Sequence, residues 1–347
     1  MAEITTQEIK EYLKKIQGQT VTLKDIRVEF NILPGSKSFD AIRNIMFQLA
    51  EQKVVRTVGS RGEYKVVTPV KPVQIFGTQR ERRQPFELVF PRSFSTMEEM
   101  DFAKNVVVRE GDLITLGGVK SKGKTTLCLQ FCAENVSKNP VLMGNEYTTL
   151  IEDKESGSVT YEPTSRFLNR LDTMKEWVDW VDDKGMDKFT LLPVRDDYAE
   201  HIVKDKINII DWVNLSGDRL YDIGKLLERI KANIGRGVAI VALQKGAGAS
   251  APRGGQFVSD FSDLEILLDG FGQNEDDVLL TIKGCKEKTK PIVGKTYAYT
   301  IGGSGTKIFN FREVKKCHVC SGTGFSKGNY CGDCEGKGWT NVGGSEY

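Results

Sequence analysis

Apolar residues recur in the first part of the chain at helical spacing and then in short alternating runs. Residues 5–16 place Ile9, Leu13 and Ile16 on one side of a predicted helix. The segments LKDIRVEF and SFDAIRNIMFQLAEQ predict two further helices, and KVVRTVGSRGEYKVV contains two alternating runs joined by GSRG, which predicts a β-hairpin. Three helices and a hairpin therefore make up a first domain over residues 1–68.

From about residue 105 the pattern changes to strands that alternate with helices. Strand-like runs such as DLITLGG, NPVLMGNE, KFTLLPV, KINIIDWV and GVAIVALQ alternate with the helical segments TTLCLQFCAENV, SRFLNRLDTMKEWVDWVD and LYDIGKLLERIKANI. The runs DLEILLDG, VLLTIKGC, KTYAYTI and KIFNF complete the sheet. This alternation predicts an α/β domain with a mainly parallel sheet over residues 96–313. The proline-rich residues 69–95 predict an extended linker, either solvated or docked on a neighbouring subunit.

The first domain resembles a winged-helix domain, a variant of the helix-turn-helix. In that arrangement the third helix enters the major groove of DNA and the hairpin touches the backbone. The candidate DNA contacts are Lys37, Arg43 and Asn44 on the helix, with Arg56 and Arg61 on the wing. Binding to a protein is the alternative role for this domain.

Composition narrows the class of protein. Hydrophobic residues make up 39% of the 347 residues, which is enough for a folded core, and the net charge of +2 argues against a wholly electrostatic nucleic-acid binder. We see no apolar run of about 18 residues, so no membrane span and no membrane partner are expected. The start, MAEITTQEIKEYLKK, carries charges where a signal peptide would be apolar, so we expect a cytoplasmic protein.

The segment TLGGVKSKGKTTL, residues 115–127, has the pattern of a phosphate-binding loop. Gly118, Gly123, Lys124 and Thr125 satisfy G-x-x-x-x-G-K-[ST] between a predicted strand and a predicted helix. Backbone N–H groups and the positive end of the helix suit phosphate, Lys124 can reach the β- and γ-phosphates, and the Thr125 hydroxyl can bind Mg²⁺. The predicted nucleotide ligands are Gly118, Val119, Lys120, Ser121, Lys122, Gly123, Lys124, Thr125 and Thr126, with ATP as the nucleotide.

Three polar residues close neighbouring strands of the predicted sheet. Asp211 ends INIID, where its carboxylate can hold Mg²⁺ together with Thr125. Glu146 ends PVLMGNE and is a candidate to orient the attacking water, because the ends of parallel strands lie at one rim of a sheet. Gln244 ends VAIVALQ and can sense the γ-phosphate. Alternatively, Glu146 is a solvated carboxylate in a loop, and Asp211 is an ordinary residue at the end of a strand.

On these motifs the domain resembles the RecA-like ATPases, and among them replicative DnaB-type helicases and their phage relatives. The resemblance spans roughly residues 86–313 and rests on GGVKSKGKTTL, VLMGNE, INIIDWVNL and VAIVALQKG. It implies a ring or filament with ATP sites at subunit interfaces. Lys286 and Lys288 resemble the family's Lys-x-Arg pair that reaches into the neighbour's site, although lysine here replaces the arginine and lacks its planar fork.

The same resemblance implies loops that hold single-stranded DNA. The stretch KGAGASAPRGGQFVSDFSD after Gln244 is glycine-rich and carries Lys245 and Arg253, and NLSGDRL with Arg219 is a second candidate loop. A plain surface loop is the alternative for the first stretch. The winged helix and the tail depart from the DnaB pattern, so processive unwinding does not follow from the resemblance.

The tail over residues 314–347 contains CHVCSGTGFSKGNYCGDCEGKGW, with Cys317, Cys320, Cys331 and Cys334 as two C-x-x-C pairs. Two such pairs predict one tetrahedral Zn²⁺ site of structural type, and a disulfide pair is the alternative, which the cytosol disfavours. Each pair is followed by Gly-x-Gly, so the tail resembles the zinc knuckles of the DnaJ family. Its use would be contact with nucleic acid or with protein.

The sequence thus predicts an α/β RecA-like P-loop core with an N-terminal winged helix and a C-terminal zinc knuckle. The favoured function is a DNA-dependent ATPase, either a helicase or translocase of replication or an ATPase of recombination. The expected partners are single-stranded and double-stranded DNA, further copies of the chain, and replication or recombination proteins. The alternatives are an ATP-gated DNA-binding adaptor or loader without motor activity and, less favoured, a small-molecule phosphotransferase.

Overall fold

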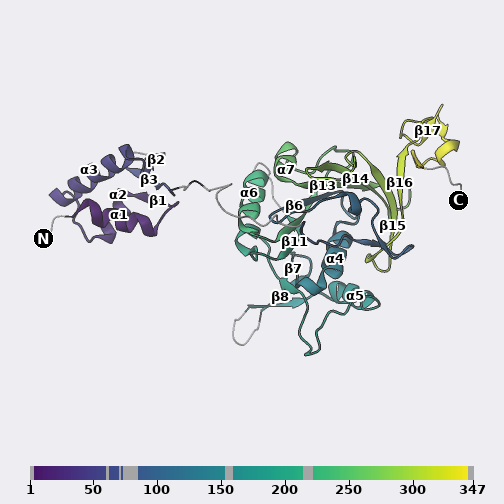
Figure 1. Ribbon diagram of the computed structural model, residues 1–347, viewed down its shortest axis with the longest axis horizontal. Coiled ribbons are helices and arrows are strands. Elements are labelled where there is room, and N and C mark those ends of the chain that lie inside the picture. The colour runs from purple at the N-terminus through teal and green to yellow at the C-terminus, as the bar shows by residue number, and fades with distance from the viewer. Residues whose placement is uncertain are drawn as a thin grey trace. The chain divides into compact units, whose positions relative to one another are not determined.

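The computed structural model describes residues 4–59, 62–69, 72, 85–152, 159–213 and 222–342. The chain divides into two compact units, Met1–Arg82 and Arg83–Tyr347 (Figure 1). The second unit includes residues 85–95 of the expected linker, where Leu88 and Phe90 are buried in the same core as the sheet. It also includes the cysteine-rich tail.

The first unit consists of three helices and a small antiparallel sheet. The helices are α1 (Thr6–Lys15), α2 (Leu23–Glu29) and α3 (Lys37–Glu51), and the strands β1 (Thr20–Thr22), β2 (Val55–Thr57) and β3 (Glu63–Val66) lie in the order β1-β3-β2. Capping boxes at Thr5 and Thr22 begin α1 and α2. The three predicted helices and the hairpin are present, and β1 adds a third strand that the sequence pattern did not indicate.

The second unit is built on a ten-stranded sheet in the order β10-β7-β11-β12-β6-β13-β14-β15-β16-β19. Its strands are β6 (Leu113–Gly118), β7 (Val141–Met143), β10 (Thr190–Leu192), β11 (Ile207–Val213), β12 (Val238–Gln244), β13 (Leu264–Gly270), β14 (Asp277–Cys285), β15 (Thr296–Gly302), β16 (Lys307–Lys316) and β19 (Trp339–Asn341). The strands from β10 to β13 pair in parallel, and those from β14 to β19 extend the sheet in antiparallel fashion. The predicted mixed α/β fold with a large parallel sheet is confirmed.

Helices cover both faces of the parallel strands (Figure 1). One face packs on α4 (Lys124–Glu134) and α5 (Ser165–Met174), and the other packs on α6 (Ile223–Asn233) and α7 (Gln256–Phe261). Successive strand residues serve opposite cores, as Leu113 and Ile114 do. Burial on both faces explains why these strands read as continuous apolar runs rather than as alternating ones.

Short elements complete the second unit. They are the strand pairs β4 (Arg92–Ser93) with β5 (Glu98–Glu99), β8 (Thr148–Glu152) with β9 (Val159–Pro163) and β17 (Phe325–Ser326) with β18 (Asn329–Tyr330), and the 3₁₀ helices Ala103–Asn105, Val136–Lys138, Tyr198–His201 and Gly332–Cys334. Among the described residues, no helix is long and apolar enough to cross a membrane.

Two sequence expectations were wrong in extent. The helix expected over SRFLNRLDTMKEWVDWVD ends at Met174, because the chain folds back so that the Trp180 indole donates to the Leu171 carbonyl at 3.2 Å. The stretch expected to be a long loop after Gln244 contains α7, because Phe257 and Phe261 pack near Gly224 of α6.

Candidate functional site

The phosphate loop connects β6 to α4 at the centre of the sheet, between β12 and β13. Gly123 precedes the helix with a left-handed φ of 79°. The Lys124 ammonium donates to the carbonyls of Gly118 and Val119, both at 2.9 Å. Burial lowers the pKa of Lys124, and the nearby Asp211 carboxylate opposes that effect. The lysine therefore lies inside the loop, where a phosphate would meet a charge that is poorly solvated by water.

Asp211 lies beside this lysine, near the end of β11. It is 2% exposed, and its Oδ2 accepts a hydrogen bond from the Tyr147 hydroxyl at 2.6 Å. Burial raises the pKa of Asp211, while the Tyr147 and Thr125 hydroxyls and the Lys124 charge offset part of that rise. A buried carboxylate with an incompletely compensated charge suits a site that receives a cation.

The donor set fits Mg²⁺. Asp211 Oδ1 is fully buried and has no hydrogen-bond partner among the described residues, and the Thr125 hydroxyl lies close enough to lower the pKa of this carboxyl. Carboxylate and hydroxyl oxygens are hard ligands of the kind that Mg²⁺ binds together with nucleotide phosphates. The two residues that the sequence pairs for the metal, Thr125 and Asp211, are therefore neighbours in the structure.

Glu146 lies at the same rim, three residues past the end of β7. Its side chain is exposed, its Oε1 accepts a hydrogen bond from the Trp212 indole at 3.3 Å, and its charge acts on both Lys124 and Asp211. The structure thus brings the proposed base to the phosphate loop and leaves it open to water.

Sequence reasoning missed three residues that position this group. Tyr147 orients Asp211, Trp212 orients Glu146, and Gly144 lets the chain after β7 pass the Asp211 carbonyl, where a Cβ would collide. Tyr147 and Trp212 each directly follow a predicted site residue. Their positions next to Glu146 and Asp211 in the sequence were the available signal. Only the tertiary structure shows that Tyr147 bonds to Asp211 and that Trp212 bonds to Glu146.

Gln244 also lies at this rim, since it pairs with Gly118 across β12 and β6. Its carbonyl accepts the Arg253 N–H at 2.9 Å, so the loop of residues 245–255 returns to the strand end where it began. Arg253 is exposed.

The sequence predicts that Lys245 contacts DNA, but the structure buries its side chain. Its side chain is 1% exposed and forms an ion pair with Asp269 at the end of β13. Its charge is used inside the fold, because a buried ammonium needs a partner. Arg219, the other channel candidate, lies outside the described residues.

Lys286 and Lys288 lie at the opposite rim of the sheet. They follow β14, whose last residue Cys285 pairs with Leu264, and Leu264 in turn pairs with Ile114 near the start of β6. Roughly 16 Å of strand lies between that position and the phosphate loop. Both side chains are exposed; the Lys286 ammonium contacts Asp263 at 3.0 Å, and that of Lys288 donates to the Cys285 carbonyl.

The DNA candidates of the first unit are exposed where the structure describes them. Lys37, Arg43 and Asn44 lie on α3, and Arg56 lies on β2, whereas Arg61 falls outside the described residues. The exposed surface of α3 also contains Phe47, which is 63% exposed.

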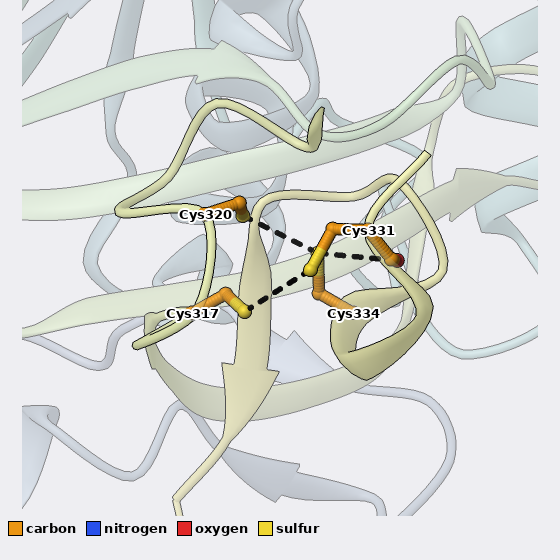
Figure 2. A group of neighbouring side chains, drawn as sticks. All are labelled: Cys317, Cys320, Cys331 and Cys334. Atoms are coloured by element: carbon orange, nitrogen blue, oxygen red, sulfur yellow. Dashed lines mark hydrogen bonds between the residues drawn. The ribbon is translucent and has the colours of Figure 1, made fainter. Parts of the chain in front are cut away.

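The four tail cysteines form a single buried cluster (Figure 2). The Sγ atoms of Cys317 and Cys331 are 3.8 Å apart, and those of Cys320 and Cys334 are 3.6 Å apart. Tetrahedral Zn²⁺ with Zn–S bonds of about 2.3 Å requires sulfurs about 3.8 Å apart, so the cluster fits zinc. All four are free thiols, and the predicted four-cysteine cluster is confirmed.

The two cysteine knuckles repeat each other at a spacing of fourteen residues, so that Cys317 lies against Cys331 and Cys320 lies against Cys334. In each, a glycine N–H donates to a sulfur: Gly324 to Cys320 at 3.3 Å and Gly338 to Cys334 at 3.1 Å. Burial raises the pKa of Cys320, but the N–H groups of Gly324 and Gly322 and the Cys334 and Cys317 thiols outweigh it and bring that pKa to about 6, whereas burial raises the pKa of Cys334. Such donation favours the thiolate, which is the form that binds a metal.

Comparisons with known proteins leave the family open. No family model matches the chain, and no curated protein matches it. Among solved structures, the crystal structure of the RadB recombinase is similar, with 15% sequence identity and a TM-score of 0.39 over 58% of this chain and 91% of that chain. We draw no conclusion about function from that likeness.

Neutralising Asp211 and neutralising Asp269 should have opposite effects on the stability of the fold. Asp211→Asn should raise the free energy of unfolding of the nucleotide-free, Mg²⁺-free chain at neutral pH, because it removes a carboxylate whose ionisation burial opposes. The gain should disappear as the pH falls toward the ordinary value of 3.8, since Asp211 is then protonated in the folded and the unfolded states alike.

The matched variant is Asp269→Asn, which leaves Lys245 buried without its partner and should cost about 3 kcal/mol. Denaturant titrations across this pH range measure both. Destabilisation of similar size in the two variants would contradict the view that Asp211 is held at a cost to the fold.

Replacing Gly324 should loosen the zinc centre. Its φ is +79°, and a Cβ would collide with the Gly336 carbonyl of the other knuckle, so Gly324→Ala introduces strain of about 1–3 kcal/mol. We expect zinc to pass to a chelator about tenfold faster than from the parent chain, as measured by a colorimetric zinc indicator. Gly332→Ala is the control, because nothing lies within 4 Å of its added Cβ; equal release from both variants would refute the expectation.

Proposed function

We propose that this chain is a DNA-dependent ATPase of the RecA-like class. In this proposal ATP is hydrolysed at interfaces between copies of the chain, and hydrolysis moves or remodels single-stranded DNA. The observation that carries the proposal is the convergence of Lys124, Thr125, Asp211 and Glu146 at one rim of a parallel sheet, with Gln244 beside them.

Each residue has a role that follows from its position. Lys124 and the loop N–H groups bind the phosphates, while Thr125 and Asp211 hold the cation. Glu146 is exposed beside them, where it can orient a water molecule and accept its proton. When bound, Mg-ATP supplies the phosphoryl group and the charge that these residues stabilise.

The location of Lys286 and Lys288 supports an oligomer. They lie at the rim opposite the chain's own phosphate loop, so within one copy they are remote from it. In a head-to-tail ring or filament, one copy's lysine rim would face the next copy's phosphate rim. The lysines would then stabilise charge on the neighbour's nucleotide.

The position of Gln244 supports coupling between the nucleotide site and the loop that is proposed to bind DNA. It is adjacent to Gly118 in the sheet, and its carbonyl holds Arg253 in the loop that follows. A change at the phosphate loop can therefore alter the loop that carries an exposed arginine. The fold of the first unit supports a winged helix as a second DNA contact, through Arg43, Asn44 and Arg56.

The proposal is tested at Glu146. Glu146→Gln should lower DNA-stimulated ATP hydrolysis about 10²- to 10⁴-fold and leave the affinity for a non-hydrolysable ATP analogue nearly unchanged, because the amide cannot accept the proton. Phosphate release with and without oligo(dT) measures turnover, and equilibrium dialysis measures binding. Glu162→Gln, an exposed carboxylate on β9, is the control that should behave like the parent chain.

The outcomes separate the candidate functions. DNA binding with negligible turnover in the parent chain would replace the motor with an ATP-gated adaptor. A folded chain that binds no ATP analogue even at millimolar concentration would overturn both.

Mixing experiments test the shared site. Lys286→Ala and Glu146→Gln chains should each be weak alone, yet their mixture should hydrolyse ATP faster than the mean of the two. The reason is that some interfaces then combine an intact Glu146 with an intact Lys286. Lys290→Ala, in the same exposed segment, is the control and should remain active without mixing. Lack of complementation in assemblies shown to be mixed would count against a role for Lys286 in the neighbour's site.

A further inference from the structure

The zinc tail presents two stacked aromatic rings to solvent. Phe325 and Tyr330 face each other across the β17–β18 hairpin, with ring centroids 4.9 Å apart and planes at 27°. They are 52% and 61% exposed, and the buried cluster of the tail consists of its four cysteines alone. These rings therefore contribute little to a core, and their exposure calls for a different explanation.

The aromatic pair is held in place from behind. The Tyr330 ring packs against Gly336, where an added Cβ would come to 2.5 Å from the ring. The Tyr330 hydroxyl accepts a hydrogen bond of 2.7 Å from the Gln273 amide, in the turn between β13 and β14. The rings are thus fixed to the zinc knuckle and to the main sheet, so a ligand would not have to order them on binding.

The described residues of the tail, 314–342, carry four lysines and two carboxylates. The two acidic side chains of the described tail each have a local partner: Asp333 lies 3.5 Å from His318, and Glu335 lies 2.9 Å from Lys337. By contrast, Lys315, Lys316 and Lys327 are exposed and form no ion pair with any residue that the structure describes. Lys327 lies in the two-residue turn directly between the aromatic strands.

A cavity adjoins the same tyrosine. It has a volume of about 420 Å³ and lies between the second knuckle and the β13–β14 turn. Its lining includes Tyr330, the amides of Gln273 and Asn274, the Lys337 ammonium and the carboxylates of Asp277 and Glu335. An aromatic face with amide and charged groups beside it suits the face and edge of a nucleobase, whereas an apolar peptide would leave these polar groups unpaired.

We propose that the zinc tail is a binding site for single-stranded nucleic acid, separate from the ATPase site. Bases stack on Phe325 and Tyr330, one base enters the cavity beside Gln273, and Lys315, Lys316 and Lys327 contact the phosphates. Zinc acts by holding the knuckles that support the hairpin. This inference goes beyond the proposed function, because the site requires neither ATP nor its hydrolysis.

Photocrosslinking tests the site directly. The full-length, zinc-loaded chain is irradiated without nucleotide in the presence of oligo(dT) that carries 5-iodouracil, and the crosslinked peptides are identified by mass spectrometry. We expect crosslinks on the peptide containing Phe325 and Tyr330, and we expect them to persist in Lys124→Ala. Loss of ATP binding in that variant therefore leaves this test intact, so failure of the ATPase proposal and failure of this one are distinguishable.

Affinity measurements give the size of the effect. Phe325→Ala should weaken oligo(dT) binding by the tail about 5- to 100-fold, Phe325→Trp should retain it, and Tyr161→Ala, an exposed aromatic on β9, should leave it unchanged. Replacing Lys315, Lys316 and Lys327 together by glutamine should reduce the slope of log K against log salt by about 2. Zinc content, measured in parallel, shows that each variant keeps its knuckles.

Two results would overturn the proposal. One is crosslinking confined to peptides outside the tail, with affinity unaffected in Phe325→Ala. The other is Phe325-dependent binding of a reduced, unfolded polypeptide without any oligo(dT) crosslink to the tail. That result would assign the aromatic surface to protein binding.

Discussion

The site depends on a buried carboxylate held against a buried lysine. Asp211 and Lys124 lie at the ends of different strands, yet parallel pairing through β12 brings β6 and β11 to a common rim. Each charge is poorly solvated and is partly offset by the other, and Tyr147 also donates a hydrogen bond to Asp211. The fold accepts this arrangement because β6, β11 and β12 are buried on both faces and leave the strand ends little freedom to shift.

The zinc tail relies on the opposite kind of constraint. Its cluster of buried residues contains only cysteines, so the ligation of a metal would take the place of an apolar core. Its contacts with the rest of the second unit include the pairing of β19 with β16, the packing of Trp339 against the apolar cluster that contains Phe271 and Leu279, and the hydrogen bond from Gln273 to Tyr330. The turn that contains Gln273 also contacts the phosphate loop, since the Lys122 ammonium donates to the Glu275 carbonyl at 2.6 Å. The tail and the nucleotide loop therefore contact the same short segment.

The two rims of the sheet give the proposed function its geometry. One rim carries Lys124, Asp211, Glu146 and Gln244, and the other carries Lys286. Within one copy these rims are remote from each other, so under the proposed function activity would depend on assembly. The nucleic-acid surface proposed on the tail belongs to each copy alone, and an assembly would present it repeatedly along a strand.

The sequence by itself determined the local chemistry. Loop spacing predicted roles for Lys124 and Thr125, strand ends predicted roles for Asp211, Glu146 and Gln244, and the C-x-x-C pairs predicted the four-cysteine cluster that the structure contains, because such motifs are set by short-range geometry. Only the tertiary structure decided what lies between strands: the bonds from Tyr147 to Asp211 and from Trp212 to Glu146, the burial of Lys245 against Asp269, and the end of α5 at Met174. These features depend on register and packing between segments far apart in the chain, and periodicity within one segment carries no information about them.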